Sequence, residues 1–400
     1  MTTTINNKHK KLNVPNLRFP EFQGEWKKCK LGDECNVFMC KRILASQTNT
    51  EGSVPFYKIG TIGGTPDAYI SKELFDDYKA KYNYPHKGEV MITCAGTVGK
   101  CVIYDGKDAY YQDSNIVWID NPSQHINNGF LYHLLANVNW RKLNSTTIIR
   151  IYNDDLRNLK LSYPQIEEQK KISRLLSLLD ERIATQNKII EDLKKLKSAI
   201  SKLLFTRKDL LETTIRLADI ATLKNGYAFQ SSKYNILGKW KIITIANVSG
   251  GRYINEEDCN CIINLPNDIQ DHQVLKEGDI LISLTGNVGR VSLCKSGAYL
   301  LNQRVGLLQI EGNIDKEFLY QVLSSRRFEN SMIACGQGAA QMNIGKGDVE
   351  NFVLPYSSNA NNIHLVARIL HSYDECIINE LRELTLLTMQ KQYFLVQMFI

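Results

Sequence analysis

The chain has 400 residues, of which 43% are hydrophobic, and a formal net charge of +7. This length exceeds one ordinary domain and predicts two or three domains with real cores. No run of eighteen apolar residues occurs, and the polar N-terminal segment lacks the apolar core of a signal peptide, so we expect no membrane span and a cytoplasmic location.

The positive charge is concentrated in two places. Residues 1–30 contain seven Lys or Arg against two acids, and residues 165–207 contain ten against six. A basic stripe along a helix is typical of a nucleic-acid partner. A solvated helix face accounts for the charge equally well, so charge alone does not decide between these interpretations.

Residues 1–163 form the first predicted domain, of mixed α+β character. Short apolar runs bounded by turn residues predict strands, and one longer run predicts a helix. The strands are expected at residues 54–60, 88–96, 100–104 and 115–120, and the helix at residues 130–140.

A long helix is predicted from Gln165 to Phe205, a stretch without Gly or Pro. Apolar residues recur at alternating spacings of three and four, interrupted by Gln186 and Lys197, which is typical of a coiled-coil seam. The seam residues are Leu176, Leu179, Ile183, Ile190, Leu193, Ile200 and Leu204. We assign residues 164–207 to this helix.

Residues 208–357 repeat the pattern of the first domain. Strands are expected at residues 241–248, 279–286, 290–294 and 304–310, and a helix at residues 316–330. The turn Gly96-Thr-Val-Gly99 corresponds to Gly286-Asn-Val-Gly289 at an offset of 190. Such glycines favour tight turns with positive φ rather than direct ligand contacts.

Residues 358–400 repeat the long helix at an offset of 194. The seam residues become Leu370, Tyr373, Ile377, Leu384, Leu387, Phe394 and Met398. Even the two polar positions recur, as Glu380 and Lys391. A repeat of this length indicates duplication of a domain-sized unit rather than a solenoid.

The two helices are expected to bury their stripes against each other as an antiparallel intramolecular coiled coil with pseudo-twofold symmetry. Parallel pairing in register would place Lys197 against Lys391 in the seam, which is costly. Antiparallel pairing centred on Ile190 and Leu384 places Lys197 near Ile377, where the lysine can reach water. It also places Gln186 near Leu387.

The sequence shows no convincing catalytic, cofactor or metal site. Gly99-Lys100 lacks the preceding glycine of a phosphate loop, where Cys94 stands, and Cys101 replaces its Ser or Thr. The ten cysteines and seven histidines lack zinc-site spacing. We therefore expect a protein that binds a partner and is not itself an enzyme.

Two variable modules alternating with two similar helices resemble the specificity subunit of type I restriction-modification systems. The resemblance covers nearly the whole chain. It is carried by residues 16–22, Glu25-Trp26, Leu31-Gly-Asp33, the two Gly-x-x-Gly turns and Pro164-Gln-Ile-Glu-Glu-Gln169. The second helix departs from this pattern, because Asn361-Asn-Ile363 replaces Glu167-Glu-Gln169.

The resemblance implies that both modules are target-recognition domains for a bipartite, asymmetric DNA sequence with a fixed spacer. The helices would set the spacer and dock two methyltransferase subunits, which restriction subunits then join. S-adenosylmethionine would bind the methyltransferase, and ATP and magnesium the restriction subunit, so this chain itself would bind no cofactor.

Candidate DNA contacts are basic and amide side chains on predicted loops, because these groups read base edges and phosphates. They are Lys41, Arg42, Lys58, Lys100, Arg141 and Lys142 in the first module, and Lys224, Arg252, Arg290, Gln303 and Arg304 in the second. The alternative function is a coiled-coil adaptor that binds proteins only, without DNA.

Overall fold

The structure is a computed structural model that describes residues 12–113, 115–143, 150–337 and 342–400. Two compact units divide the chain. Unit 1 comprises Met1–Thr185 with Leu384–Ile400, and unit 2 comprises Gln186–Glu383. Each unit thus combines one module with parts of both long helices, a division that differs from the four predicted domains. The basic residues Lys8, Lys10 and Lys11 lie outside the described residues.

Unit 1 contains a four-stranded sheet of order β2-β8-β5-β6, a three-stranded sheet of order β4-β3-β7, and the pair β1-β9. All four residues of β5 are buried. The strands are β1 (Lys27–Lys30), β2 (Asn36–Met39), β3 (Val54–Tyr57), β4 (Tyr69–Ile70), β5 (Val90–Thr93), β6 (Cys101–Ile103), β7 (Tyr110–Tyr111), β8 (Ile116–Asp120) and β9 (Lys160–Tyr163). The short helices are α1 (Leu31–Glu34), α2 (Lys72–Lys81), α3 (Asn128–Asn137), α4 (Trp140–Leu143) and α5 (Asn153–Arg157).

Unit 2 has the sheets β11-β18-β15-β16 and β13-β12-β17-β14 and the pair β10-β19. The strands are β10 (Thr213–Arg216), β11 (Ala221–Asn225), β12 (Trp240–Ile243), β13 (Asn260–Ile262), β14 (Val274–Leu275), β15 (Ile280–Ser283), β16 (Val291–Leu293), β17 (Tyr299–Leu301), β18 (Val305–Ile310) and β19 (Val353–Tyr356). The short helices are α7 (Lys316–Leu323), α8 (Arg326–Gly336) and α9 (Lys346–Glu350).

The two units share one strand topology. Strands β2, β8, β5 and β6 correspond in order to β11, β18, β15 and β16. The neighbouring sheet in each unit contains a parallel pair, β3 with β7 in unit 1 and β12 with β17 in unit 2. The predicted α+β fold with an internal repeat is therefore confirmed.

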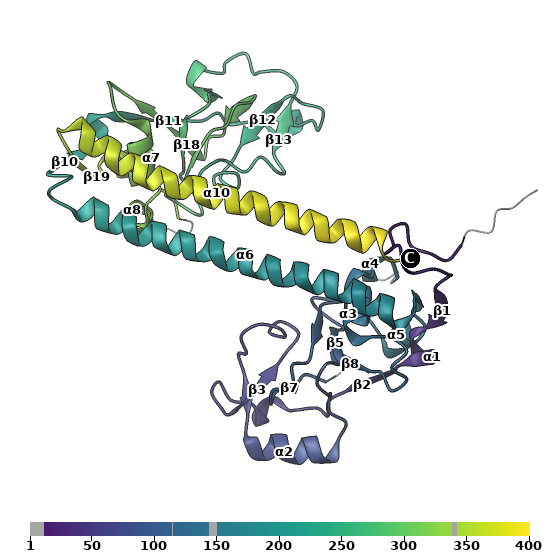
Figure 1. Ribbon diagram of the computed structural model, residues 1–400. Coiled ribbons are helices and arrows are strands. Elements are labelled where there is room, and N and C mark those ends of the chain that lie inside the picture. Colours follow the sequence, from purple (N-terminus) through teal and green to yellow (C-terminus); the bar gives the residue numbers. More distant parts are fainter. Residues whose placement is uncertain (1–11, 114, 144–149, 338–341) are drawn as a thin grey trace, which may run out of the picture. The chain divides into compact units, whose positions relative to one another are not determined.

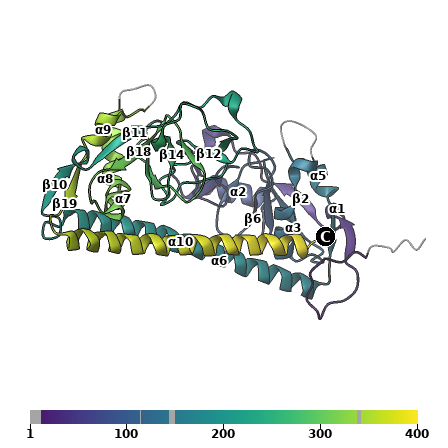
Figure 2. The same ribbon diagram turned by 90° about the horizontal axis from the view of Figure 1, so that it is seen from above.

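The long helices are α6 (Ile166–Thr206) and α10 (Ala360–Gln397). Within each unit they lie side by side in both views (Figure 1, Figure 2). In unit 1, Lys391 forms an ion pair with Asp180, and in unit 2, Lys197 forms one with Asp374, whose Nζ–Oδ1 distance is 2.6 Å. Residue numbers rise along one helix as they fall along the other, so the helices are antiparallel. The two ion pairs are equivalent at the offset of 194.

All fourteen predicted seam residues are buried or half-buried. Side-chain contacts add detail that the apolar stripe did not predict. The Gln186 side-chain amide donates to the backbone and the carboxylate of Glu380, its own equivalent at the offset of 194. Lys197 is bound to Asp374.

The start of α6 is fixed by the Glu-Glu-Gln segment. The fully buried Glu168 carboxylate accepts two hydrogen bonds of 2.7 Å from Arg18. Gln169 donates to the carbonyls of His125 and Pro164 and accepts from the Asn127 backbone N–H. These bonds attach the helix to the N-terminal segment and to the module, which explains the segment's polar composition.

The start of α10 is fixed by different contacts. Asn362, equivalent to Glu168, donates from its side chain to the carbonyl of Leu210 at 3.0 Å. Ile363, equivalent to Gln169, is buried in the core of unit 2. The Glu212 carboxylate accepts from the backbone N–H and hydroxyl of Ser358. The loss of the Glu-Glu-Gln segment is therefore compensated by other polar and apolar contacts.

Candidate nucleic-acid interface

Each unit builds the same tight turn after its central strand. The turn from Thr93 to Lys100 has Gly96 and Gly99 at φ values of +62° and +84°. The Gly99 N–H donates to the carbonyl of Thr93 at 2.8 Å, and the Lys100 N–H donates to its hydroxyl at 3.0 Å. Glycine is required at such φ values, because other L-residues meet steric strain there.

The second unit repeats these two hydrogen bonds. Gly286 and Gly289 have φ values of +71° and +75°. The Gly289 N–H donates to the carbonyl of Ser283 at 2.9 Å, and the Arg290 N–H donates to the Ser283 hydroxyl at 3.0 Å. The frame is thus kept while the cation at its end changes from Lys100 to Arg290.

Two further segments join each turn. In unit 1, the Cys94 N–H donates to the carbonyl of Asn115 at 2.7 Å, and the Ile151 N–H donates to the carbonyl of Cys94 at 2.9 Å. We define loop cluster 1 as residues 94–100, Asn115 and residues 150–152. Three segments distant in sequence therefore meet at one place.

Loop cluster 2 has the same connections. The Leu284 N–H donates to the carbonyl of Arg304 at 3.0 Å, and the Ile344 N–H donates to the carbonyl of Leu284 at 2.9 Å. We define this cluster as residues 284–290, 302–304 and 342–345. Both clusters arise from the shared topology, whereas their side chains differ.

The candidates of the first module lie in three places. Lys100 donates to the carbonyl of Ile62, which brings residues 58–63 against loop cluster 1. Arg141 and Lys142 are exposed on α4, next to Trp140, which packs on Gly99. Arg42 pairs with Asp113 at 2.8 Å, Lys58 pairs with Asp67 at 3.1 Å, and Lys41 lies over the Tyr82 ring. Arg42, Lys58, Lys100, Arg141 and Lys142 are thus at or beside loop cluster 1, and Lys41 contacts the end of α2.

The candidates of the second module converge on loop cluster 2, with one exception. Gln303 and Arg304 are exposed, and Arg290 is half-buried and donates to the carbonyl of Ser249 at 3.4 Å. Lys224 pairs with Leu307 in the β11–β18 register, close to the start of β18. Arg252 does not belong with them.

Arg252 is a buried structural residue, and we withdraw it as a DNA contact. Its side chain is 7% exposed and binds both oxygens of Glu317, at 2.8 and 2.6 Å. It also donates to Asp374 at 3.1 Å and lies over the Tyr320 ring. Burial alone raises the pKa of Glu317, but the bonds from Arg252 and Gln321 hold it below its usual value.

No equivalent charged network occurs among the described residues of unit 1. Gly129 occupies the position equivalent to Glu317, and the buried His133 occupies that of Gln321. Burial lowers the pKa of His133 to about 4, so this ring is neutral near pH 7 beside the pair of Asp180 and Lys391. Both units therefore contain the ion pair in the helix seam. The module residues that contact this pair differ between the two units.

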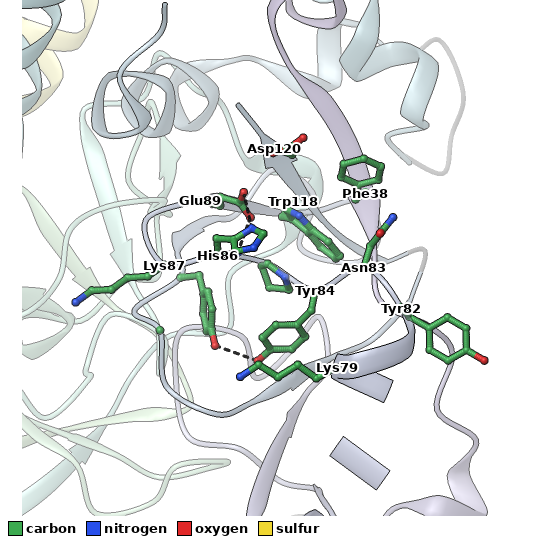
Figure 3. Close-up of a pocket in the computed structure, with 13 residues that line it drawn as sticks. Phe38, Lys79, Tyr82, Asn83, Tyr84, His86, Lys87, Glu89, Trp118 and Asp120 are labelled. Carbon is green, nitrogen blue, oxygen red and sulfur yellow. Dashed lines mark hydrogen bonds and ion pairs between the residues drawn. The ribbon is translucent and has the colours of Figure 1, made fainter. Parts of the chain in front are cut away.

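A surface pocket of about 550 Å³ lies at the far end of β8 from loop cluster 1. Aromatic residues line it together with His86 and Glu89, which face each other (Figure 3). Burial raises the pKa of Glu89. Its carboxylate accepts from the His86 backbone N–H at 2.7 Å, just as Asp279 accepts from Lys276 in a smaller pocket of unit 2. These acids close a repeated turn.

Two further findings concern metals and membranes. Among the described residues, no group of three or more His, Cys, Asp or Glu side chains is placed to hold a metal ion. In the same ranges, no helix combines the length and apolarity that a membrane span requires.

The fold and the clusters define a duplicated two-module protein in which one backbone frame presents two different sets of side chains. The chain belongs to the type I restriction-modification DNA specificity family, whose pattern matches residues 23–195 and 212–388.

Two relatives and one solved structure agree with this assignment. The type I restriction enzyme MjaVIII specificity subunit of Methanocaldococcus jannaschii is 30% identical over 373 residues, covering 85% of this chain and 83% of that protein. A putative specificity subunit of Haemophilus influenzae, S.HindORF215P, is 50% identical over 164 residues, but this match covers only 41% of the chain and 42% of that relative. The S subunit structure from M. genitalium has a TM-score of 0.62 at 18% identity over 97% of this chain and 99% of that one, which shows the shared fold.

Proposed function

We propose that this chain is the DNA sequence-specificity subunit of a type I restriction-modification complex. In this proposal each module reads one half of a bipartite, asymmetric target, and the helices fix the spacer between the halves. The observation that carries the proposal is the pair of loop clusters. The hydrogen bonds that join the three segments are the same in both clusters, but Lys100 and Asn115 in one correspond to Arg290 and Arg304 in the other.

The exposed cations support a DNA ligand. Lysine and arginine neutralise phosphates, while arginine and glutamine also read base edges in the major groove. Arg141 and Lys142 beside loop cluster 1 would contact backbone or bases of the first half-site. Gln303 and Arg304 in loop cluster 2 would do so in the second. Because the two sets differ, the two half-sites should differ in sequence.

Apolar side chains exposed on the long helices support docking of methyltransferase subunits. Exposed apolar surface can mark a protein interface. In unit 1 it consists of Leu178, Leu386, Met389, Tyr393 and Val396, and in unit 2 of Ile189, Leu196, Leu203, Leu365 and Leu381. Two methyltransferase subunits would bind here, and restriction subunits would join them in the cytoplasm.

The chain itself would transfer no methyl group and cut no DNA. S-adenosylmethionine would be held by the methyltransferase, and ATP and magnesium by the restriction subunit. The contribution of this chain is to choose the site.

Methylation mapping tests the proposal. Cells that express the cognate methyltransferase with and without this chain are compared by sequencing of modified bases. We expect a bipartite motif that is present only with the chain. Unchanged methylation would contradict the proposal and favour a coiled-coil adaptor that binds proteins without DNA.

A further inference from the structure

Two aliphatic side chains project from unit 2 without covering anything. Ile236 is 94% exposed and Leu237 is 85% exposed, more than any other large hydrophobic residue among those described. Exposure of single apolar residues is common, but two adjacent and almost fully exposed aliphatic side chains are not explained by packing.

The turn that bears these side chains is held firmly. The Asn235 N–H donates to the carbonyl of Cys261 at 2.8 Å, and its carbonyl accepts from the Gly238 N–H at 2.9 Å. The Asn235 side chain accepts from the Leu237 N–H at 2.9 Å. A Cβ at Gly238 would lie 2.5 Å from backbone atoms of Ile262, so the turn is pressed against β13. Ile236 and Leu237 are therefore presented at a fixed point.

The segment around this turn is basic. Residues 226–241 contain three lysines and no acidic residue. Lys241 is paired with Glu256 at 2.8 Å. Lys233 and Lys239 are exposed, and neither forms an ion pair with any described residue. We call Ile236 and Leu237 the apolar tip. Lys233 precedes this tip by three residues in sequence, and Lys239 follows it by two.

The same segment begins at loop cluster 2. The Tyr227 N–H donates to the carbonyl of Leu301 at 2.8 Å, and the Gln303 N–H donates to the carbonyl of Tyr227 at 3.0 Å. Gln303 belongs to the cluster that we assign to the second half-site. The chain therefore runs directly from this cluster to the tip within nine residues.

We propose that Ile236 and Leu237 form an apolar wedge that inserts between neighbouring base pairs of the bound duplex, with Lys233 and Lys239 on the adjacent phosphates. This inference rests on the proposed function. Isoleucine and leucine wedges unstack single base steps in DNA-bending proteins. A protein partner is less suited to the tip, because two side chains supply little of the roughly 800 Å² that each side of a stable protein interface buries.

The test compares complexes of the full chain with its methyltransferase. The double variant Ile236→Ser with Leu237→Ser should fold normally, because both side chains lie in solvent. Val353→Ser is the control, since Val353 is an exposed apolar residue of the same unit outside the basic segment. The probe is a set of duplexes with the mapped motif, in which 2-aminopurine replaces one base at a time, because its fluorescence rises when it unstacks.

With the wild type and Val353→Ser, we expect raised fluorescence at one base step in or beside the second half-site. The double variant should lose this signal and bind the duplex about tenfold more weakly. Absence of an unstacked step with the wild type, or an unchanged step and affinity with the double variant, would overturn the wedge. Loss of the methyltransferase from the double variant would also overturn it, in favour of a protein partner. A wild-type complex without motif-specific binding would instead contradict the proposed function.

Discussion

Replacing Gly99 with alanine is expected to destabilise unit 1 by about 2–5 kcal/mol and to abolish reading of the first half-site. The φ of Gly99 is +84°, which costs an L-residue about 1–2 kcal/mol. The new Cβ would also lie 2.2 Å from Cδ1 of Trp140. Overpacking of this kind adds about 1–3 kcal/mol, and it displaces the helix that carries Arg141 and Lys142.

Gly88→Ala is the matched control for this variant. Gly88 has a φ of +92°, but its nearest neighbour would be the Asn128 side-chain nitrogen at 4.0 Å. It therefore shares the backbone strain and lacks the collision with Trp140. Thermal unfolding and methylation mapping are the measurements. Equal stability of the two variants, with the motif intact in both, would show that the turn is not constrained as described.

Replacing Arg252 with methionine is expected to lower the free energy of unfolding by about 3–5 kcal/mol, the usual cost of breaking a buried ion pair. The loss leaves the Glu317 carboxylate half-buried without its bidentate partner. Arg252 lies in the segment that also accepts a hydrogen bond from Arg290. We therefore expect relaxed reading of the second half-site and an unchanged first half-site.

Two further variants sharpen this prediction. Arg42→Met removes an ion pair whose arginine is 67% exposed and should cost less than about 1 kcal/mol. Adding Glu317→Met to Arg252→Met removes the unpaired carboxylate and should restore part of the lost stability. Chemical denaturation measures all three. A cost for Arg252→Met no greater than that for Arg42→Met would refute the role of the network.

The fold was largely predictable because the sequence contains the same domain-sized unit twice. Seam positions with the same two polar interruptions indicated two equivalent helices, and the shared Gly-x-x-Gly turns indicated two equivalent modules. The exact register was not predictable from apolar spacing alone. Asp180 and Asp374 lie one residue beyond seam positions, and their ion pairs with Lys391 and Lys197 fix the alignment that the stripe leaves open.

The charged network in unit 2 could not be found by comparing the repeats. Arg252 and Glu317 are 65 residues apart, and the first repeat has Gly129 where the second has Glu317. A basic residue on a predicted loop gave the same signal whether it faced solvent or a buried carboxylate. The tip at Ile236 and Leu237 was missed for a related reason, since apolar residues in a loop are more often buried than displayed.

The candidate contacts of the two clusters remain predictions at the level of single residues. The structure brings most of them to the same ends of their sheets as the duplicated turns. Lys41 instead lies over the Tyr82 ring, and the buried Arg252 no longer counts as a candidate DNA contact. Residues that contact a ligand usually lie on loops held by a rigid scaffold. A sequence repeat therefore locates the scaffold better than it locates the individual contact residues.

In the proposed function, the modules read the half-sites while the helices set the spacer. The variant that tests these roles carries seven additional helical residues between Thr185 and Gln186 and seven between Glu383 and Leu384. Methylation mapping then measures its spacer and its half-sites. Seven residues lengthen a helix by about 10 Å, the rise of about three base pairs. We predict a spacer longer by about three base pairs with both half-sites unchanged. Altered half-sites at an unchanged spacer would contradict this division of roles between modules and helices.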